Sequence, residues 1–276
     1  MSDYFNTGEY VDYLRKNCGV GGYDFEEKSE YFTGPDVKIL VDYLTMMEIK
    51  PENKVLEIGC GLGRVLREIH DRFGARPYGV DVSQKTVDEA AARVGRLCSE
   101  LKVSSAERLH YPDHYFDRVL LWGVFDLTDQ SPSLMEVTRV TKQGGLVLVT
   151  GKNDSYRDDD LEAYEAENAA RRKGIPNHFT DFGAMLALSE GLGLEPVVIR
   201  YFERRGDFAK DLFRVDRPVR FYEYLIIYRK VKVVELARIL PKRISSSFSK
   251  ACVAKTAGAT QSTRSEGPKP VGHGSF

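Results

Sequence analysis

The sequence predicts an α/β fold with a seven-stranded, mostly parallel sheet and helices on both faces. From residue 54 to residue 228, apolar runs of strand length alternate with amphipathic runs of helix length. This alternation is typical of parallel strands joined by crossover helices. A strand, a glycine-rich turn and a helix also follow one another directly over residues 55–69. With 276 residues and 42% hydrophobic content, the chain can bury one large core.

The expected elements follow in order along the chain. A first helix over residues 36–47 carries its apolar residues on one stripe, and a Pro-Glu-Asn turn ends it. Strands are then predicted at residues 54–58, 77–82, 101–104, 116–122, 146–151, 195–202 and 221–228. Helices are predicted between them at residues 64–73, 84–98, 133–141, 161–173 and 181–191.

The two ends and one insertion fall outside this alternation. Residues 1–35 are polar with many aromatic rings, which predicts an arm that either packs on the surface or forms a lid over a site. Residues 36–240 form the predicted domain, with a polar insertion at 152–178. Residues 241–276 hold six Lys/Arg and one Glu among Ser, Thr and Gly, which predicts a disordered basic tail.

Composition excludes several classes of partner. The formal net charge is −1, so no general attraction to nucleic acid or anionic membranes is expected. No apolar run approaches the ~20 residues of a membrane span, and no signal peptide opens the chain. The four cysteines lack the spacing of a disulfide framework or a zinc site. We therefore expect reduced thiols, no metal and a cytoplasmic protein.

A glycine loop follows the first strand. Gly59, Gly61 and Gly63 stand at alternate positions in the run VLEIGCGLGR, with Cys60 inside the loop. Only glycine lets the backbone turn this tightly and lie flat against a ligand. The helix that follows presents unpaired N–H groups to the same place. Glu57 adds a carboxylate at this mouth, which suits a ligand that carries a cation.

A nicotinamide dinucleotide is the alternative ligand. Its fingerprint G-x-G-x-x-G/A requires a small third residue, which allows the helix to pack closely on the strand. Arg64 stands at that position, and its bulk would obstruct such packing. A nicotinamide-dependent (NAD) oxidoreductase therefore stays open as the alternative function.

Other candidate ligand residues lie at the carboxyl ends of neighbouring strands, where open parallel sheets bind ligands. Asp81, in the run GVDVS, can accept both hydroxyls of a ribose, and Val82 can pack on an adenine face. A helix N-cap is the structural alternative for Asp81, although Ser83 can fill that role. Trp122 ends the fourth strand and is assigned to the same ligand.

Three segments resemble the class I (Rossmann-like) S-adenosylmethionine-dependent methyltransferase family. The spacing E-x-G-x-G-x-G is similar to the first motif of this family. The run from Pro112 to Asp117 is similar to its Pro-Asp-x-x-Phe-Asp entry to the fourth strand. Residues 133–151 resemble its helix with a Glu-x-x-Arg pair, a Gly-Gly turn and a fifth strand. The resemblance covers residues 36–151 well and residues 179–230 loosely.

This resemblance implies further features of the site and the fold. S-adenosylmethionine is the implied cofactor, with Ser105 and Ala106 at its adenine because the family often has Asp-Ala there. A serine hydroxyl accepts a hydrogen bond more weakly than a carboxylate. The resemblance also implies that the last strand is antiparallel and inserted beside the preceding strand.

The implied activity is methyl transfer to a small-molecule acceptor, at oxygen more than at nitrogen. After the fourth strand the chain reads WGVF, without the D-P-P-Y or N-P-P-Y run of enzymes that methylate amino groups of nucleic acids or glutamine. A non-catalytic binding protein with a methyltransferase fold is a further alternative. His178 is the candidate base, with Asp126 and Asp154 after the fourth and fifth strands as alternatives, and a surface histidine before a helix cap is the structural alternative for His178. The loop 203–220 has a net charge of +2, which favours an acceptor with phosphate or carboxylate.

Overall fold

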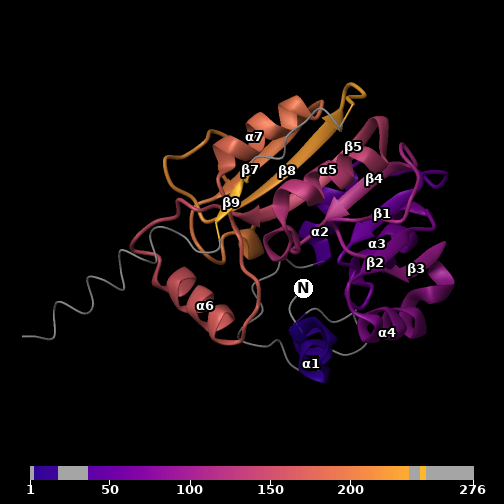
Figure 1. The fold of residues 1–276 in the computed structure, drawn as a ribbon, viewed down its shortest axis with the longest axis horizontal. Helices are drawn as coiled ribbons and strands as arrows, with labels where there is room; N and C mark the ends of the chain where they lie inside the picture. Colours follow the sequence, from indigo (N-terminus) through magenta and orange to yellow (C-terminus); the bar gives the residue numbers. More distant parts are fainter. Residues whose placement is uncertain (1–2, 18–36, 236–242, 247–276) are drawn as a thin grey trace, which may run out of the picture.

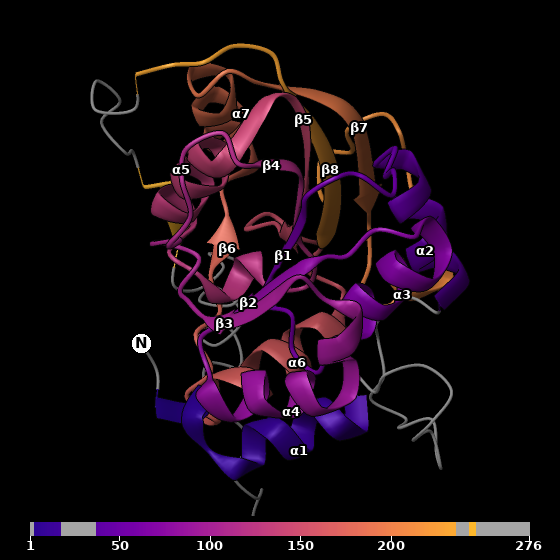
Figure 2. The same cartoon turned by 90° about the vertical axis from the view of Figure 1, so that its right-hand side faces the viewer.

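A computed structural model describes residues 3–17, 37–235 and 243–246. Seven strands form one mixed sheet in the order β3-β2-β1-β4-β5-β8-β7 (Figures 1 and 2). The seven-stranded sheet of the sequence prediction is therefore confirmed. The strands are β1 (Val55–Ile58), β2 (Tyr78–Asp81), β3 (Glu100–Val103), β4 (Phe116–Leu121), β5 (Thr141–Lys152), β7 (Leu194–Phe202) and β8 (Glu223–Lys230).

The first five strands pair in parallel and β8 runs against them. β8 lies between β5 and β7 and is antiparallel to both. This placement confirms the expected antiparallel last strand inserted beside its predecessor. Because β8 is reversed, its first residue lies at the sheet edge where the parallel strands end. Glu223, which opens β8, consequently stands directly opposite Lys152, which ends β5.

Helices cover both faces of the sheet. The helices are α1 (Gly8–Asn17), α2 (Val37–Met46), α3 (Arg64–Phe73), α4 (Gln84–Val94), α5 (Gln130–Val140), α6 (Leu161–Arg172) and α7 (Phe182–Gly191). Short 3₁₀ turns occur at η1 (Asp3–Asn6), η2 (Gly95–Leu97), η3 (Phe125–Leu127) and η4 (Phe208–Lys210). None of the helices in the described ranges is both long and apolar enough to cross a membrane.

The sheet divides the hydrophobic core into two clusters, and successive side chains of β5 belong alternately to one and the other. Val147 and Val149 are buried in the cluster that includes side chains of α5 and α7. Leu146 and Leu148 are buried in the cluster that includes side chains of α2 and α3. Successive strand side chains point to opposite faces, so a strand covered on both faces is apolar throughout. Each such buried side chain contributes about 1.5–3 kcal/mol.

Several predicted boundaries differ from the observed ones, among them the start of β5 at Thr141 instead of residue 146 and the end of α4 at Val94 instead of residue 98. α5 begins at Gln130 instead of residue 133, because a proline such as Pro132 is tolerated in the first turn of a helix. Residues 243–246 were assigned to the disordered tail, but β9 (Ser245–Ser246) pairs with β6 (Phe179–Thr180). Ile244 beside it is fully buried. One apolar residue in a Ser- and Lys-rich segment has no periodicity to reveal it. Residues 247–276 of the expected tail lie outside the described residues.

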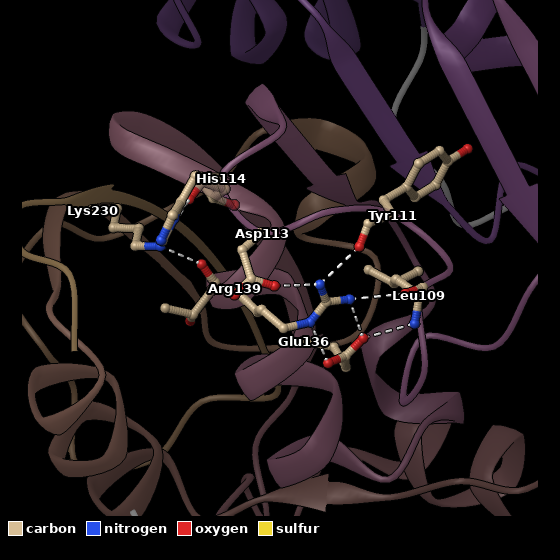
Figure 3. Close-up of polar contacts among 9 residues, drawn as sticks. Leu109, Tyr111, Asp113, His114, Glu136, Arg139 and Lys230 are labelled. Carbon is tan, nitrogen blue, oxygen red and sulfur yellow. Dashed lines mark hydrogen bonds and ion pairs between the residues drawn. The ribbon is translucent and has the colours of Figure 1, made fainter. Parts of the chain in front are cut away.

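The Glu-x-x-Arg pair of α5 fastens the loop between β3 and β4 (Figure 3). The Arg139 guanidinium donates to both carboxylate oxygens of Glu136 at 2.8 Å. It also donates to the carbonyl oxygens of Leu109 at 2.8 Å and Tyr111 at 2.7 Å. Glu136 accepts in turn from the Leu109 N–H at 2.8 Å. Asp113 completes the contacts at 2.8 Å from Arg139. This pair is therefore scaffold, and it fixes the loop that leads into β4.

A buried lysine closes the other end of the same loop (Figure 3). Lys230, the last residue of β8, donates to the carbonyl oxygens of Thr138 at 2.7 Å and Thr141 at 2.8 Å. Its Nζ lies 3.0 Å from His114 Nδ1. Burial lowers the pKa of Lys230 to about 8. The lysine thus ties β8 to the carboxyl end of α5, where partial negative charge from the helix dipole favours a cation.

Candidate functional site

The three glycines of the loop after β1 serve two different purposes. All three have positive φ angles, +71° at Gly59, +51° at Gly61 and +87° at Gly63, a region that only glycine enters freely. A Cβ at Gly59 would lie 2.5 Å from Val124, and one at Gly63 would lie 2.3 Å from Val94. These two glycines therefore permit close packing. A Cβ at Gly61 would meet only Leu14, at 3.9 Å, so Gly61 leaves room for a ligand.

Two carboxylates flank the glycine loop. Asp81 accepts from the Gly61 N–H at 3.1 Å and from the Ser83 N–H at 3.0 Å. Ser83 is the N-cap of α4 and accepts from the Thr86 N–H at 3.3 Å. The capping role that was the alternative for Asp81 thus belongs to Ser83. Burial raises the pKa of Asp81, although its backbone hydrogen bonds oppose the shift.

Of the two carboxylates, Glu57 is the one with an oxygen that is buried without a hydrogen-bond partner in the described residues. Its side chain is 2% exposed, and Oε2 has no hydrogen-bond partner among the described residues. Burial raises the pKa of Glu57 well above its usual range, Asp81 adds to this effect and Arg64 opposes it. An unpartnered buried carboxylate oxygen is costly. A bound cation at this position would offset that cost.

A cavity of about 350 Å³ opens at the carboxyl edge of the sheet, with the glycine loop in its wall. A smaller cavity of about 60 Å³ adjoins it and shares Gly59, Phe5 and Tyr10 with it. Of the predicted ligand residues, Glu57, Gly59, Cys60, Gly61 and Trp122 line the larger cavity. Gly59, Asp81, Val82 and Ala106 line the smaller one. The sequence-predicted site is therefore brought together with few exceptions.

Ser105 is one exception, since it lines neither cavity. Its hydroxyl is hydrogen-bonded to the Glu107 carboxylate and accepts from the Glu107 N–H at 3.1 Å. Ser104 and Glu107, its neighbours on either side, line the smaller cavity with Ala106. The assignment of Ser105 to the adenine therefore stays a prediction. Glu107, which holds the Ser105 hydroxyl, brings a carboxylate to the wall of the smaller cavity.

His178 also stands outside both cavity walls. Its N–H donates to the Asp126 carbonyl oxygen at 2.7 Å, and its own carbonyl accepts from Gln130 Nε2 at 3.2 Å. Its Nδ1 is buried without a partner in the described ranges. The adjacent Asn177 lines the larger cavity instead. The backbone of His178 therefore fastens the end of the insertion to η3 and α5, and its assignment as the base stays a prediction.

A cluster of charged residues lies at the larger cavity, and its lysine was not predicted from the sequence. Lys152 Nζ lies 2.9 Å from Asp126 Oδ2 and 3.4 Å from Glu167 Oε1, and it donates to Asn177 Oδ1 at 3.3 Å. Glu167, on α6, also accepts from Asn177 Nδ2 and the Tyr222 hydroxyl. Burial lowers the pKa of Lys152, but the two carboxylates raise it well above its usual range. Lys152 is therefore a fixed cation in the cavity wall.

The positive loop 203–220 contributes little charge to this cavity. Its arginines form ion pairs with acidic residues, as in Arg204–Asp159 at 2.8 Å and Arg220–Asp158 at 2.6 Å. The insertion thus neutralises much of the excess charge that favoured an anionic acceptor. Of the charged residues in this loop, Arg205 lines the cavity, and it donates to the Tyr222 hydroxyl at 3.2 Å.

The described part of the N-terminal arm lies over both cavities. Phe5 and Tyr10 line the two cavities together with the loop after β1. Their rings meet edge to face with centroids 5.1 Å apart. Leu14 of α1 is buried in the cluster that includes Cys60 and Val94. α1 consequently lies alongside α4 in both views of the fold (Figures 1 and 2). Residues 18–35 of the arm lie outside the described residues.

Comparison with known proteins places these residues in a family context. A family model described as a methyltransferase domain matches residues 55–145. The ubiquinone/menaquinone biosynthesis C-methyltransferase UbiE of Bordetella parapertussis is 38% identical over 109 residues, 37% of this chain and 41% of that protein. Phosphoethanolamine N-methyltransferase 1 of Arabidopsis thaliana is 26% identical over 175 residues, 62% of this chain and 35% of that protein. The chain thus spans less than half the length of these relatives.

A similar fold occurs in geranyl diphosphate C-methyltransferase from Streptomyces coelicolor. That crystal structure contains Mg²⁺, geranyl-S-thiolodiphosphate and S-adenosyl-L-homocysteine. The TM-score is 0.58 at 15% sequence identity, and the match covers 83% of this chain and 99% of the other. At this identity the similarity establishes the fold. Among the residues that the structure of the present protein describes, no group of three or more His, Cys, Asp or Glu is arranged to hold a metal ion.

Proposed function

The chain carries a class I, S-adenosylmethionine-dependent methyltransferase domain, and on this premise we propose that it transfers a methyl group to a hydroxyl of a small-molecule acceptor. S-adenosylmethionine supplies a methyl carbon attached to a positively charged sulfur. The transfer therefore depends more on positioning the acceptor in line than on acid–base groups. The chain must hold a cationic donor and present a second compound to it.

The observation that carries this proposal is the buried, unpartnered Oε2 of Glu57 beside the glycine loop. A cationic donor gives this oxygen a partner, whereas a pyrophosphate would repel it. Gly61 leaves the room that a ligand needs against the backbone. We assign the ribose hydroxyls to Asp81, whose oxygens each keep a lone pair beyond their backbone contacts. The adenine is assigned to the smaller cavity between Val82 and Ala106.

The part of the larger cavity beyond Glu57 and Gly61, around Lys152 and Arg205, is assigned to the acceptor. The three cations of this cavity among the described residues, Arg64, Lys152 and Arg205, stand beside the carboxylates of Glu57, Asp126 and Glu167 and the Tyr222 hydroxyl, so an anionic acceptor would meet no surplus of positive charge. A neutral hydroxyl compound fits this balance better. The run WGVF after β4 also favours oxygen over nitrogen as the methylated atom.

Calorimetric titration tests the donor assignment. We expect the purified protein to bind S-adenosylmethionine and S-adenosylhomocysteine with micromolar dissociation constants and NAD far more weakly. Tighter binding of NAD would overturn the proposal in favour of an oxidoreductase. Donor binding without methyl transfer to any compound in a broad metabolite extract would instead support a binding protein.

A further inference from the structure

Glu223 brings a carboxylate to the acceptor cavity from an unexpected strand. It opens β8, and the reversed direction of β8 puts it opposite Lys152 at the ligand edge of the sheet. Its side chain lines the larger cavity with Lys152 and Arg205. This position is set by the register of β8 against both of its neighbours, since Glu223 also stands opposite Phe202 of β7. Two ladders of backbone hydrogen bonds thus fix where the carboxylate stands.

Lys152 is already bound by other side chains, whereas the Glu223 carboxylate has charged neighbours but no hydrogen bond from a side chain in the described ranges. Charges facing it come from four segments, namely Asp126 on η3, Lys152 on β5, Glu167 on α6 and Arg205 after β7. Lys152 is bound by Asp126, Glu167 and Asn177. No residue in the described ranges donates a hydrogen bond to the Glu223 carboxylate. A partly buried acceptor of hydrogen bonds in a cavity wall is thus left for a ligand.

The other side chains in the cavity wall indicate the shape and polarity of the ligand that fits there. Aromatic and aliphatic side chains surround the cavity, among them Phe5, Tyr10, Trp122, Leu127 and Phe208. Trp122 and Phe208 lie with ring centroids 5.5 Å apart. Such surfaces favour a planar, apolar molecule, because aromatic rings prefer edge-to-face and offset contacts. The ligand should therefore combine an apolar ring with one polar group directed at Glu223.

Resting on the proposed function, we propose that Glu223 is the general base and that the acceptor is a phenol-type hydroxyl compound. The hydroxyl proton passes to the Glu223 carboxylate as the oxygen forms a bond to the methyl carbon. The bond from that carbon to the sulfonium sulfur breaks, and its electron pair stays on sulfur as a neutral thioether. Lys152 and Arg205 stabilise the negative charge that develops on the oxygen.

The pKa of Glu223, compared with that of the acceptor hydroxyl, favours a phenol over an aliphatic alcohol. Burial raises the pKa of Glu223 to about 7, despite the opposing effect of Lys152 and Arg205. A phenol has a pKa near 10, so the base lies about three units below it. This gap is small enough for general base catalysis to be effective. An aliphatic hydroxyl is a far weaker acid and would require a stronger base.

Three probes with the same ring test the class of acceptor. Protein saturated with S-adenosylmethionine labelled in its methyl group is incubated with 4-methylphenol, 4-methylaniline or 4-methylbenzoate. We expect label transfer to 4-methylphenol alone. Transfer to the amine or the carboxylate alone, or to none of the three while the donor binds, overturns the assignment of a phenol. Failure of S-adenosylhomocysteine to bind would overturn the proposed function itself, so the two failures are distinguishable.

Glu223→Gln tests the base, with Glu195→Gln as a matched control on the exposed surface of β7. Glu223→Gln should reduce the transfer rate about 100-fold or more and abolish the rise in rate around pH 7, while Glu195→Gln changes neither. A second readout is binding in the presence of S-adenosylhomocysteine. Wild-type protein should bind 4-methylphenol about tenfold more tightly than 4-methylanisole, which has no hydroxyl proton, and Glu223→Gln should lose that preference. An unchanged pH profile and unchanged preference in Glu223→Gln would show that Glu223 is not the base.

Discussion

At the scale of single residues, Gly61 is the position where backbone conformation and ligand space coincide. Its φ of +51° resembles that of the other two glycines, but the space beyond its Cα is open. We expect Gly61→Val to weaken S-adenosylhomocysteine binding by about 100-fold or more, since the branched side chain would occupy the ligand's place. Gly144→Val is the matched control, because Gly144 also has a positive φ (+79°) and open space, but lies outside both cavities. Calorimetry on both variants checks this, and equal losses would attribute the effect to backbone strain.

Glu223 also predicts a dependence of stability on pH. Its folded pKa of about 7 lies above the ordinary value of 4.5, so the folded state binds the proton more tightly than the unfolded state. The resulting stabilisation is complete below about pH 4.5 and is lost as the pH rises through 7. The free energy of unfolding of the wild type, measured relative to Glu223→Gln, should therefore fall between pH 5 and pH 8. The fall is at most about 3 kcal/mol, because one pKa unit corresponds to about 1.4 kcal/mol. Urea titrations at several pH values measure it, and a difference that rises with pH would contradict the assignment.

At the scale of elements, removal of the N-terminal arm tests whether this segment only packs on the surface or also shields the donor site from water. Phe5 and Tyr10 line both cavities, while Arg15 holds α1 to α4 through an ion pair with Glu89 at 3.0 Å. Deleting residues 1–17 should weaken S-adenosylhomocysteine binding by about tenfold or more, because water then reaches the donor site. Arg15→Ala should change the affinity less than about fivefold, since exposed ion pairs contribute less than about 1 kcal/mol. Full affinity in the truncated protein would show that the arm only packs on the surface.

The elements also show why one half of the site could be predicted from the sequence and the other could not. The donor residues lie in short contiguous runs after β1 and β2, so the strand-end rule located them without tertiary information. The strand-end rule considers the last residues of parallel strands, whereas Glu223 is the first residue of β8. Only the antiparallel pairing of β8 shows that Glu223 lies at the same edge of the sheet. Ser105 was assigned from the resemblance to the Asp-Ala pair of the family, and in a turn a shift of one or two residues changes which side chain faces the cavity.

At the scale of the whole molecule, the fold closes through a contact that is distant in sequence. Ile244 is fully buried, its carbonyl accepts from the Asp181 N–H at 2.8 Å, and its N–H donates to Ser131 Oγ at 3.3 Å. We expect Ile244→Ala to lower the free energy of unfolding by about 2–4 kcal/mol, as for other large-to-small core substitutions. Val233→Ala, at a residue that is 53% exposed, should change it by less than about 0.5 kcal/mol. Thermal and urea denaturation compare the free energies of unfolding of the two variants. If Ile244→Ala leaves this free energy unchanged, residues 243–246 do not belong to the cooperatively folding unit.

Three charged residues of the proposed acceptor side are separated along the gene from the proposed donor residues. Glu57, Asp81 and Ala106 come from the part of the chain that matches the family model, whereas Lys152, Arg205 and Glu223 come after it. Recombination near the junction of α5 and β5 would therefore exchange one set of residues and keep the other. A lineage built in this way can acquire a new acceptor by inheriting a different second half, while its use of the methyl donor is passed on unchanged.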